Sequence, residues 1–303
     1  MALASVPAIE TPSDDLLFDR SARTRWRIGF DRWIGRLLPL LFLVAILPIL
    51  DVVYYIASSA LPTLTLHVLT DTNFRDPDAL GVPIITTAEM MTLATGLAVA
   101  FGLFGGIATA EFLSDRAASW ARTFANMLAG TPSVVVGYLG YFGFCLYFGW
   151  GYTMIAGVLT LSLFMTPYIF RIADLAFSSI PRHIREAAYG AGAHPHQYIL
   201  RVGAPIAFPQ ILNGVFLAVA IGVGETAPIV LTTHGSVILP TGLFSPAQFL
   251  TATIWENFSS PFASAVALAL QAAFILLVVV VGLNIVVRII SARYRKRLEG
   301  LFQ

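Results

Sequence analysis

The sequence predicts an all-α membrane protein with six transmembrane helices, and two observations lead to this fold class. Of its 303 residues, 57% are hydrophobic and 12% are charged, whereas about 25% of the residues of a soluble domain are charged. The apolar residues form six long blocks, and a helix of ~20 apolar residues is long enough to cross a hydrocarbon core ~30 Å thick. These features exclude a soluble globular enzyme.

The six apolar blocks are joined by shorter, more polar segments. Their approximate limits are residues 34–60, 86–112, 124–148, 152–177, 208–232 and 262–290. The third and fourth blocks are separated only by Gly149-Trp150-Gly151, which predicts a tight hairpin between antiparallel helices. Blocks two to five are rich in glycine, which permits close helix–helix approach in lipid. We therefore divide the chain into a tail at 1–33, a first helix at 34–60, a core at 86–293 and a basic tail at 294–303.

The distribution of basic residues predicts the orientation of the helices. Arginines cluster before the first block, between the second and third, between the fourth and fifth, and after the sixth, whereas the opposite side receives only Arg75. Because short loops rich in Lys and Arg stay in the cytoplasm, both termini are predicted to be cytoplasmic. Residues 1–19 have neither an arginine nor an apolar core, so we do not expect a cleavable signal peptide.

The loop between the fourth and fifth blocks is predicted to form two short helices. Pro181 is suited to the first turn of a helix, and small apolar residues recur at helical spacing from Ile184 to Ala191. Gly192 offers a helix stop, and Pro195 can open a second helix. On the residues alone, this loop is either an ordinary amphipathic connector or a docking site whose small side chains let another protein approach closely.

The same loop carries a recognisable motif, which reads Glu186-Ala187-Ala188, then Gly192, then Val202-Gly203-Ala204-Pro205. This order resembles the EAA motif of ABC importer permeases, with Val202 and Ala204 where that family has Ile and Leu. The resemblance covers about residues 86–293 and implies the type I ABC importer (MetI-like) permease fold. It also implies that the loop at 178–205 contains the coupling helix, which inserts in a cleft of a separate ATPase subunit. The coupling residues it implies are Arg185, Glu186, Ala187, Ala188, Gly192 and Pro205.

A second motif, Gly224-Glu225-Thr226-Ala227-Pro228, resembles the GETAP sequence of phosphate importer permeases, and the A-type (PstA) family matches better than the C-type. The resemblance implies phosphate transport across a bacterial plasma (inner) membrane, with no cofactor. It further implies a PstC-like second permease subunit, two PstB-like ATPase subunits and a periplasmic or lipid-anchored PstS-like phosphate-binding protein. The chain departs from this family at Ile221, where an arginine is common. Either the partner permease supplies that cation, or the substrate or its affinity differs.

The sequence gives little support for ATP hydrolysis, metal binding or nucleic-acid binding by this chain. A Walker A loop needs a lysine that reaches the nucleotide phosphates, and the one lysine, Lys296, lies between Arg295 and Arg297. ATP hydrolysis is therefore expected in a partner chain, and no nucleophile–base pair supports a membrane-embedded hydrolase. His194 and His196 lack the further ligands that a metal would need. The net charge of +1 gives no sign of a nucleic-acid partner.

Ionisable residues within the apolar blocks are candidates for the translocation path, because charges inside a membrane are costly. Arg171 precedes Asp174 by three positions, a spacing that allows a local ion pair. Arg171 either attracts phosphate in the path or extends to the cytoplasmic headgroups. Glu225, beside Thr226, lies among Gly222, Gly224 and Pro228, which make the backbone there easy to kink or unwind. It orients a basic residue, hydrogen-bonds the substrate while protonated, or serves helix packing. Glu111, at the end of the second block, is interpreted as an interfacial or packing residue.

Together these features predict a passive gate that a partner ATPase opens and closes, and the leading hypothesis is the A-type permease subunit of a phosphate importer. One rival has the same architecture and carries sulfate, molybdate or phosphonate. A second rival is a secondary transporter that uses the proton gradient through Glu225. The outer loop around Trp255, Glu256 and Asn257 is either a contact surface for the binding protein or a re-entrant linker.

Overall fold

The computed structural model describes residues 22–73, 79–233 and 235–299. Most of the predicted N-terminal tail, Arg75 between the first two predicted blocks, and the end of the C-terminal tail lie outside the described residues. The chain separates into two compact units, Met1–Tyr55 and Ile56–Gln303. Within the described residues every regular element is a helix, in agreement with the predicted fold class.

Residues 22–55 of helix α2 (Ala22–Ala60) make up the described part of the first unit. Its segment Trp33–Ala60 is apolar and long enough to cross a membrane, which matches the first predicted block. Pro39 and Pro48 lie inside the helix. Each removes one backbone hydrogen bond, and transmembrane helices tolerate such breaks better than soluble ones.

Four segments of the second unit are also long and apolar enough to cross a membrane, and they match the second, fourth, fifth and sixth predicted blocks. They are Gly81–Glu111, which is helix α4, Met154–Ser178, which is helix α7, Pro195–Val223, and Ala263–Arg293 within helix α13 (Ala263–Glu299). The segment Pro195–Val223 contains three consecutive elements. These are α9 (Pro195–Tyr198), the π-helical segment η2 (Ile199–Gly203) and α10 (Ala204–Val223).

The third predicted block is not a single helix, and the prediction was wrong in this respect. The chain forms α5 (Asp115–Ala129), then α6 (Ser133–Gly140) and the π-helical segment η1 (Tyr141–Tyr147). The axis bends by 96° between α5 and the segment that follows it. Gly130 caps the end of α5, and Pro132 lacks the backbone N–H that a continuing helix needs. Counted as one span, this bent pair brings the described residues to the six predicted crossings.

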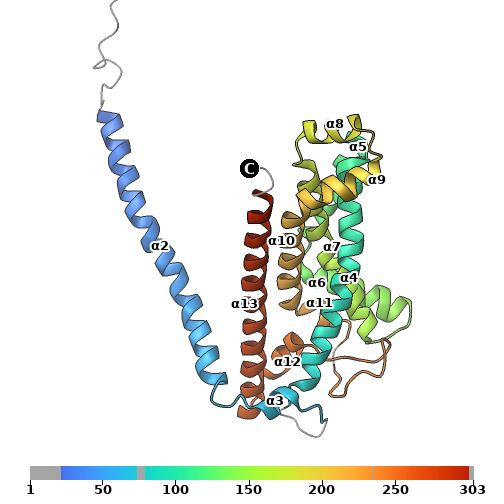
Figure 1. Cartoon of the computed structure of the whole chain (residues 1–303). Helices are drawn as coiled ribbons and strands as arrows, with labels where there is room; N and C mark the ends of the chain where they lie inside the picture. The colour runs from blue at the N-terminus through green and yellow to red at the C-terminus, as the bar shows by residue number, and fades with distance from the viewer. Residues whose placement is uncertain (1–21, 74–78, 234, 300–303) are drawn as a thin grey trace, which may run out of the picture. The chain divides into compact units, whose positions relative to one another are not determined.

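The fifth predicted block ends earlier than expected. Helix α10 stops at Val223, and the chain is non-helical until the short helix α11 (Ala227–Val230) begins. Two other short helices, α3 (Leu66–Thr70) and α12 (Leu250–Asn257), lie at one end of the second unit, and α8 (Arg182–Gly190) lies at the other end (Figure 1). The predicted hairpin turn is confirmed, with φ of +71° at Gly149 and +66° at Gly151.

Close packing of α4 against α7 forms the centre of the second unit. A Cβ atom added at Gly106 would lie 2.6 Å from the Cβ of Ala173 and 2.8 Å from the backbone nitrogen of Asp174. A Cβ added at Gly102 would lie 2.9 Å from the Cβ of Ile169. The glycines therefore permit the close helix–helix approach that their abundance predicts.

Replacing Gly106 with alanine is expected to destabilise the second unit, because the added methyl group would have to displace backbone atoms of α7. Such overpacking costs about 1–3 kcal/mol. Thermal unfolding in detergent should give a lower Tm for Gly106→Ala than for the wild type. Gly96→Ala is the control, since Gly96 lies on the same helix with no atom within 4 Å of the added Cβ. Equal Tm values for the two variants would contradict the packing argument.

Candidate functional site

Helix α8 follows α7 after the short link at 179–181. Pro181 occupies the N-cap position and not the first turn, so α8 begins one residue later than predicted. Gly192 has a φ of +84°, a conformation that favours glycine, and this confirms the predicted helix stop. The second short helix is not separate as predicted, because α9 continues through η2 into the long helix α10.

The outer surface of α8 is open. None of its residues is buried, and Glu186 and Ala187 are exposed, as is Pro205 near the start of α10. A hollow of about 300 Å³ lies beside the helix, lined by Ala188, Ala191, Gly192, Ala193, Gln197, Arg201 and Val202. The coupling residues predicted from the motif therefore reach the surface, Arg185 and Ala188 only in part.

The side chain of Arg185 points into the protein. Its Nη2 donates a hydrogen bond of 2.7 Å to Oε1 of Glu111 at the end of α4. Its Cζ lies 5.8 Å from the ring centre of Tyr198. The interaction with Tyr198, and also the charge of Glu111, raise the pKa of Arg185 above its usual range against the effect of burial. The guanidinium is therefore charged throughout the physiological pH range.

Glu111 is the partner that sequence analysis missed. Its side chain is 4% exposed, and a buried carboxylate needs a paired charge to offset its desolvation. Glu111 and Arg185 are separated by 74 positions, so no helical spacing rule connects them. The available signal was a single acid at the end of an apolar block, with an arginine-rich loop predicted on the same side of the membrane.

The predicted ion pair between Arg171 and Asp174 does not form, because Asp174 is bound by Arg122 of α5. Nε of Arg122 donates to Oδ2 of Asp174 and Nη2 donates to Oδ1, both at 2.8 Å. The hydroxyl of Ser178 also donates to Oδ1 at 3.3 Å. Helix α5 packs against α7 and presents the planar fork of Arg122 to both carboxylate oxygens, a geometry that a neighbour on α7 itself cannot reach as well.

The side chain of Arg171 is exposed beside this pair. A hollow of about 440 Å³ is lined by Arg122, Asn126, Tyr168, Arg171, Asp174, Leu217 and three other apolar residues. No ion pair of Arg171 occurs within the described ranges. Two guanidinium groups and one carboxylate leave this hollow with a net positive charge, which favours an anion.

Glu225 and Thr226 lie where the chain breaks between α10 and α11, as their neighbouring glycines and proline predict. The hydroxyl of Thr251 in α12 donates 2.7 Å to the backbone carbonyl of Glu225. The carboxyl group of Glu225 lies near the hydroxyl of Ser133 at the start of α6. Across the described part of the chain, no ion pair joins Glu225 to Arg171.

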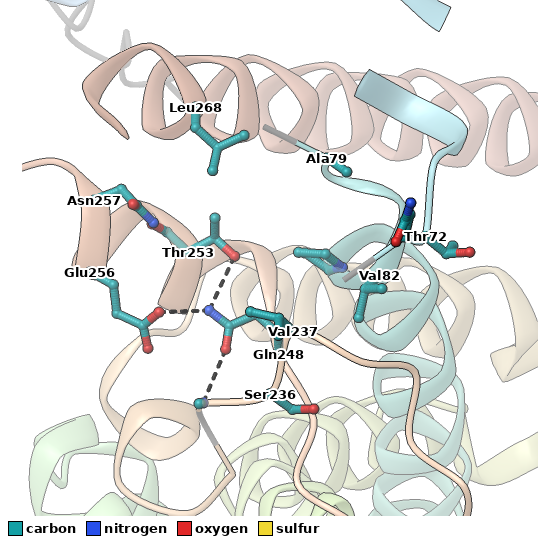
Figure 2. A pocket seen from close by; sticks show the side chains of 13 residues that line it. Thr72, Ala79, Val82, Ser236, Val237, Gln248, Thr253, Glu256, Asn257 and Leu268 are labelled. Atoms are coloured by element: carbon teal, nitrogen blue, oxygen red, sulfur yellow. Dashed lines mark hydrogen bonds between the residues drawn. The ribbon is translucent and has the colours of Figure 1, made fainter. Parts of the chain in front are cut away.

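A second polar hollow, of about 530 Å³, lies at the end of the unit opposite α8 (Figure 2). Gln248 is at its centre. Nε2 of Gln248 donates 2.8 Å to Oε2 of Glu256, and Oε1 accepts 3.1 Å from the backbone N–H of Gly235. The loop around Trp255, Glu256 and Asn257 therefore contains the helix α12 and an internal hydrogen-bond network.

Comparison with known proteins shows which family the chain belongs to. The sequence pattern of the family described as "Binding-protein-dependent transport system inner membrane component" matches residues 98–296, more than half of the chain. The chain belongs to this family. It is accordingly a multi-pass, non-catalytic subunit of an ABC transporter, whose ATPase is a separate protein.

Individual relatives show which branch of this family the chain resembles. The phosphate transport system permease protein PstA 2 of Mycobacterium bovis is 34% identical over 84% of this chain and 85% of its own length. The PstA protein of Yersinia pestis is 30% identical over 71% of this chain and 72% of its own length. A chain of the inward-facing MetNI methionine ABC transporter superposes with a TM-score of 0.60 at 17% identity, over 71% of this chain and 95% of that one. The chain is thus an ABC importer permease of the PstA family with a MetI-like fold.

Replacing Arg122 with glutamine is expected to lower the stability of the α5–α7 contact. The pair is partly exposed, since 44% of the Arg122 side chain and 13% of the Asp174 side chain are accessible, so the loss should be about 1 kcal/mol or less. Thermal unfolding in detergent measures this loss of stability. Arg116→Gln, an exposed position on the same helix, is the control. An Arg122→Gln/Asp174→Asn double variant should recover part of the loss, and no recovery would show that the charge pair is not responsible.

Proposed function

We propose that the chain is the transmembrane subunit of an ATP-driven importer of inorganic phosphate. The observation that carries this proposal is the similarity, over 84% of the chain, to a permease named for phosphate transport. The broken helix at Glu225, where the GETAP-like motif lies, supports it. A carboxyl group and exposed backbone at such a break can rearrange when a helix moves.

The proposed assembly contains a PstC-like second permease, two PstB-like ATPase subunits and a PstS-like phosphate-binding protein in a bacterial plasma membrane. Both chain termini and α8 would face the cytoplasm. The support for this orientation is the excess of arginine on the side of α8 and of the predicted tails. Substrate would pass between this chain and the second permease, since one such subunit forms half of the path.

Helix α8 and the turn after it are the proposed contact with the ATPase. The exposed positions Glu186, Ala187 and Pro205, and the hollow beside Ala188 and Gly192, suit insertion into a groove of another protein. Small side chains allow that close approach. Arg185 belongs to the coupling region in a different way, because its guanidinium is held by Glu111.

The proposed translocation path contains Arg171, Asp174, Glu225 and Thr226. Arg171 supplies a cation that lowers the desolvation cost of phosphate. Asp174 contributes indirectly, because it fixes Arg122 at the edge of the same hollow. Glu225 is unsuited to bind phosphate as a carboxylate, since like charges repel. It serves as a hydrogen-bonding group at the point where α10 ends.

Phosphate uptake by the reconstituted transporter tests the proposed function. Proteoliposomes that contain all subunits should accumulate labelled phosphate only with ATP, and a dissipated proton gradient should leave uptake unchanged. Excess unlabelled phosphate should compete, while sulfate and molybdate should not. Competition by another oxyanion would reassign the substrate, a possibility that Ile221 raises. Uptake without the ATPase would instead indicate a secondary transporter.

Glu225→Gln tests the role of the break. The variant keeps the shape of the side chain and removes its charge and proton, so uptake should fall about tenfold, since a hydrogen bond with a charged group is worth about 1.5–3 kcal/mol. The rate of labelled phosphate uptake is the measurement. Glu89→Gln, an exposed acid on α4, is the matched control and should transport normally. Normal uptake by Glu225→Gln would assign this residue to helix packing.

A further inference from the structure

Helix α8 has few anchors in the rest of the protein, one of which is Ile184, packed against a buried apolar cluster between α7 and α10. The covalent link at 179–181 is short, and none of the residues of α8 is buried. A helix held only by such a link would pivot when a partner pulls on it. The ion pair between Arg185 and Glu111, at 2.7 Å, restrains this movement, because it joins α8 to a second element, the end of α4.

Tyr198 holds the same guanidinium from another side. This tyrosine is fully buried, and its ring centre lies 5.8 Å from Cζ of Arg185 and 5.5 Å from the ring of Tyr189 in α8. It lies in α9, which continues into α10. Arg185 is therefore fixed between α4 and the start of α10, so α8 is expected to move together with both.

Helix α4 reaches from α8 to the opposite end of the unit (Figure 1). Its 31 residues correspond to a length of ~46 Å at ~1.5 Å per residue. The glycine contacts at Gly102 and Gly106 leave no room for α4 to slide independently of α7. A displacement applied at Glu111 is therefore transmitted along the helix and is not absorbed within it.

The far end of α4 is bonded to the segment that leads into α12. The hydroxyl of Thr86 donates to the backbone carbonyl of Gln248, and the backbone N–H of Leu250 donates to Thr87 Oγ1 at 3.0 Å. Both threonines are buried. The side chain of Gln248 in turn binds Glu256 and Gly235 at the second hollow (Figure 2).

We propose that α4 is a rigid link between the ATPase-facing helix and the outer hollow. The Arg185–Glu111 ion pair is its inner joint, and Thr86 and Thr87 form its outer joint. Movement of α8 changes the position of α12 and the shape of the hollow around Gln248. This inference rests on the proposed contact between α8 and an ATPase, and it makes Glu111 and Arg185 positioning residues for coupling.

The test measures hydrogen exchange in residues 235–257 of the complete transporter, with and without a non-hydrolysable ATP analogue. In the wild type, the analogue should change the exchange rate of this outer segment. In Glu111→Gln, this response should shrink by about fivefold or more. Fivefold is the lower end of the coupling factors that are typical between distant sites. The response of α8 itself should remain. The number of phosphate molecules taken up per ATP should fall in parallel.

Two further variants keep the proposal open to contradiction. Thr87→Val removes one of the two hydroxyls at the outer joint and should also reduce the response of residues 235–257, while Glu89→Gln on the same helix should retain it. A wild-type outer segment that does not respond, or a wild-type response in Glu111→Gln, would overturn the proposal. A wild-type transporter that responds to the analogue without taking up phosphate would overturn only the substrate assignment.

Discussion

The close contact between α4 and α7 is the constraint on which the second unit depends. Backbone of α7 occupies the space that a side chain at Gly106 would need, so the two helices keep one register. That register places Glu111 next to α8 and turns Asp174 toward α5. At the other end it places Thr87 against the start of α12. A shift of α4 along α7 would break the contacts of Glu111 and Thr87.

Charge pairing divides the ionisable residues of the core into two groups. Asp174 and Glu111 each hold an arginine of another element, so these four residues connect helices at modest electrostatic cost. Arg171 and Glu225 belong to no ion pair within the ranges that the structure describes. A charge that the fold retains near a membrane without a partner is a functional candidate. Ion pairing thus distinguishes the residues that connect helices from Arg171 and Glu225, which stay candidates for the proposed path.

Sequence patterns predicted the helices well, because a membrane crossing depends mainly on the length and composition of a local block. They also predicted the turn at Gly192 and the break at Glu225, since glycine and proline act locally. They failed for the bend after Gly130, because the apolar content of a block does not show whether the helix axis changes direction within it. They also failed for the partners of Arg185 and Asp174. Those partners come from α4 and α5, which only three-dimensional packing brings close.

The length of the crossing helices has a consequence for the surrounding lipid. Helix α4 is ~46 Å long by its rise, well beyond a hydrocarbon core of ~30 Å. A hydrophobic segment that exceeds the core is accommodated by tilting or by local thickening of the bilayer. Because close contacts at Gly102 and Gly106 hold α4 against α7, a tilt of α4 would be shared by both helices. The angle at which α8 would meet the proposed ATPase would then change with acyl-chain length, and membrane thickness would become a parameter of the proposed transport cycle.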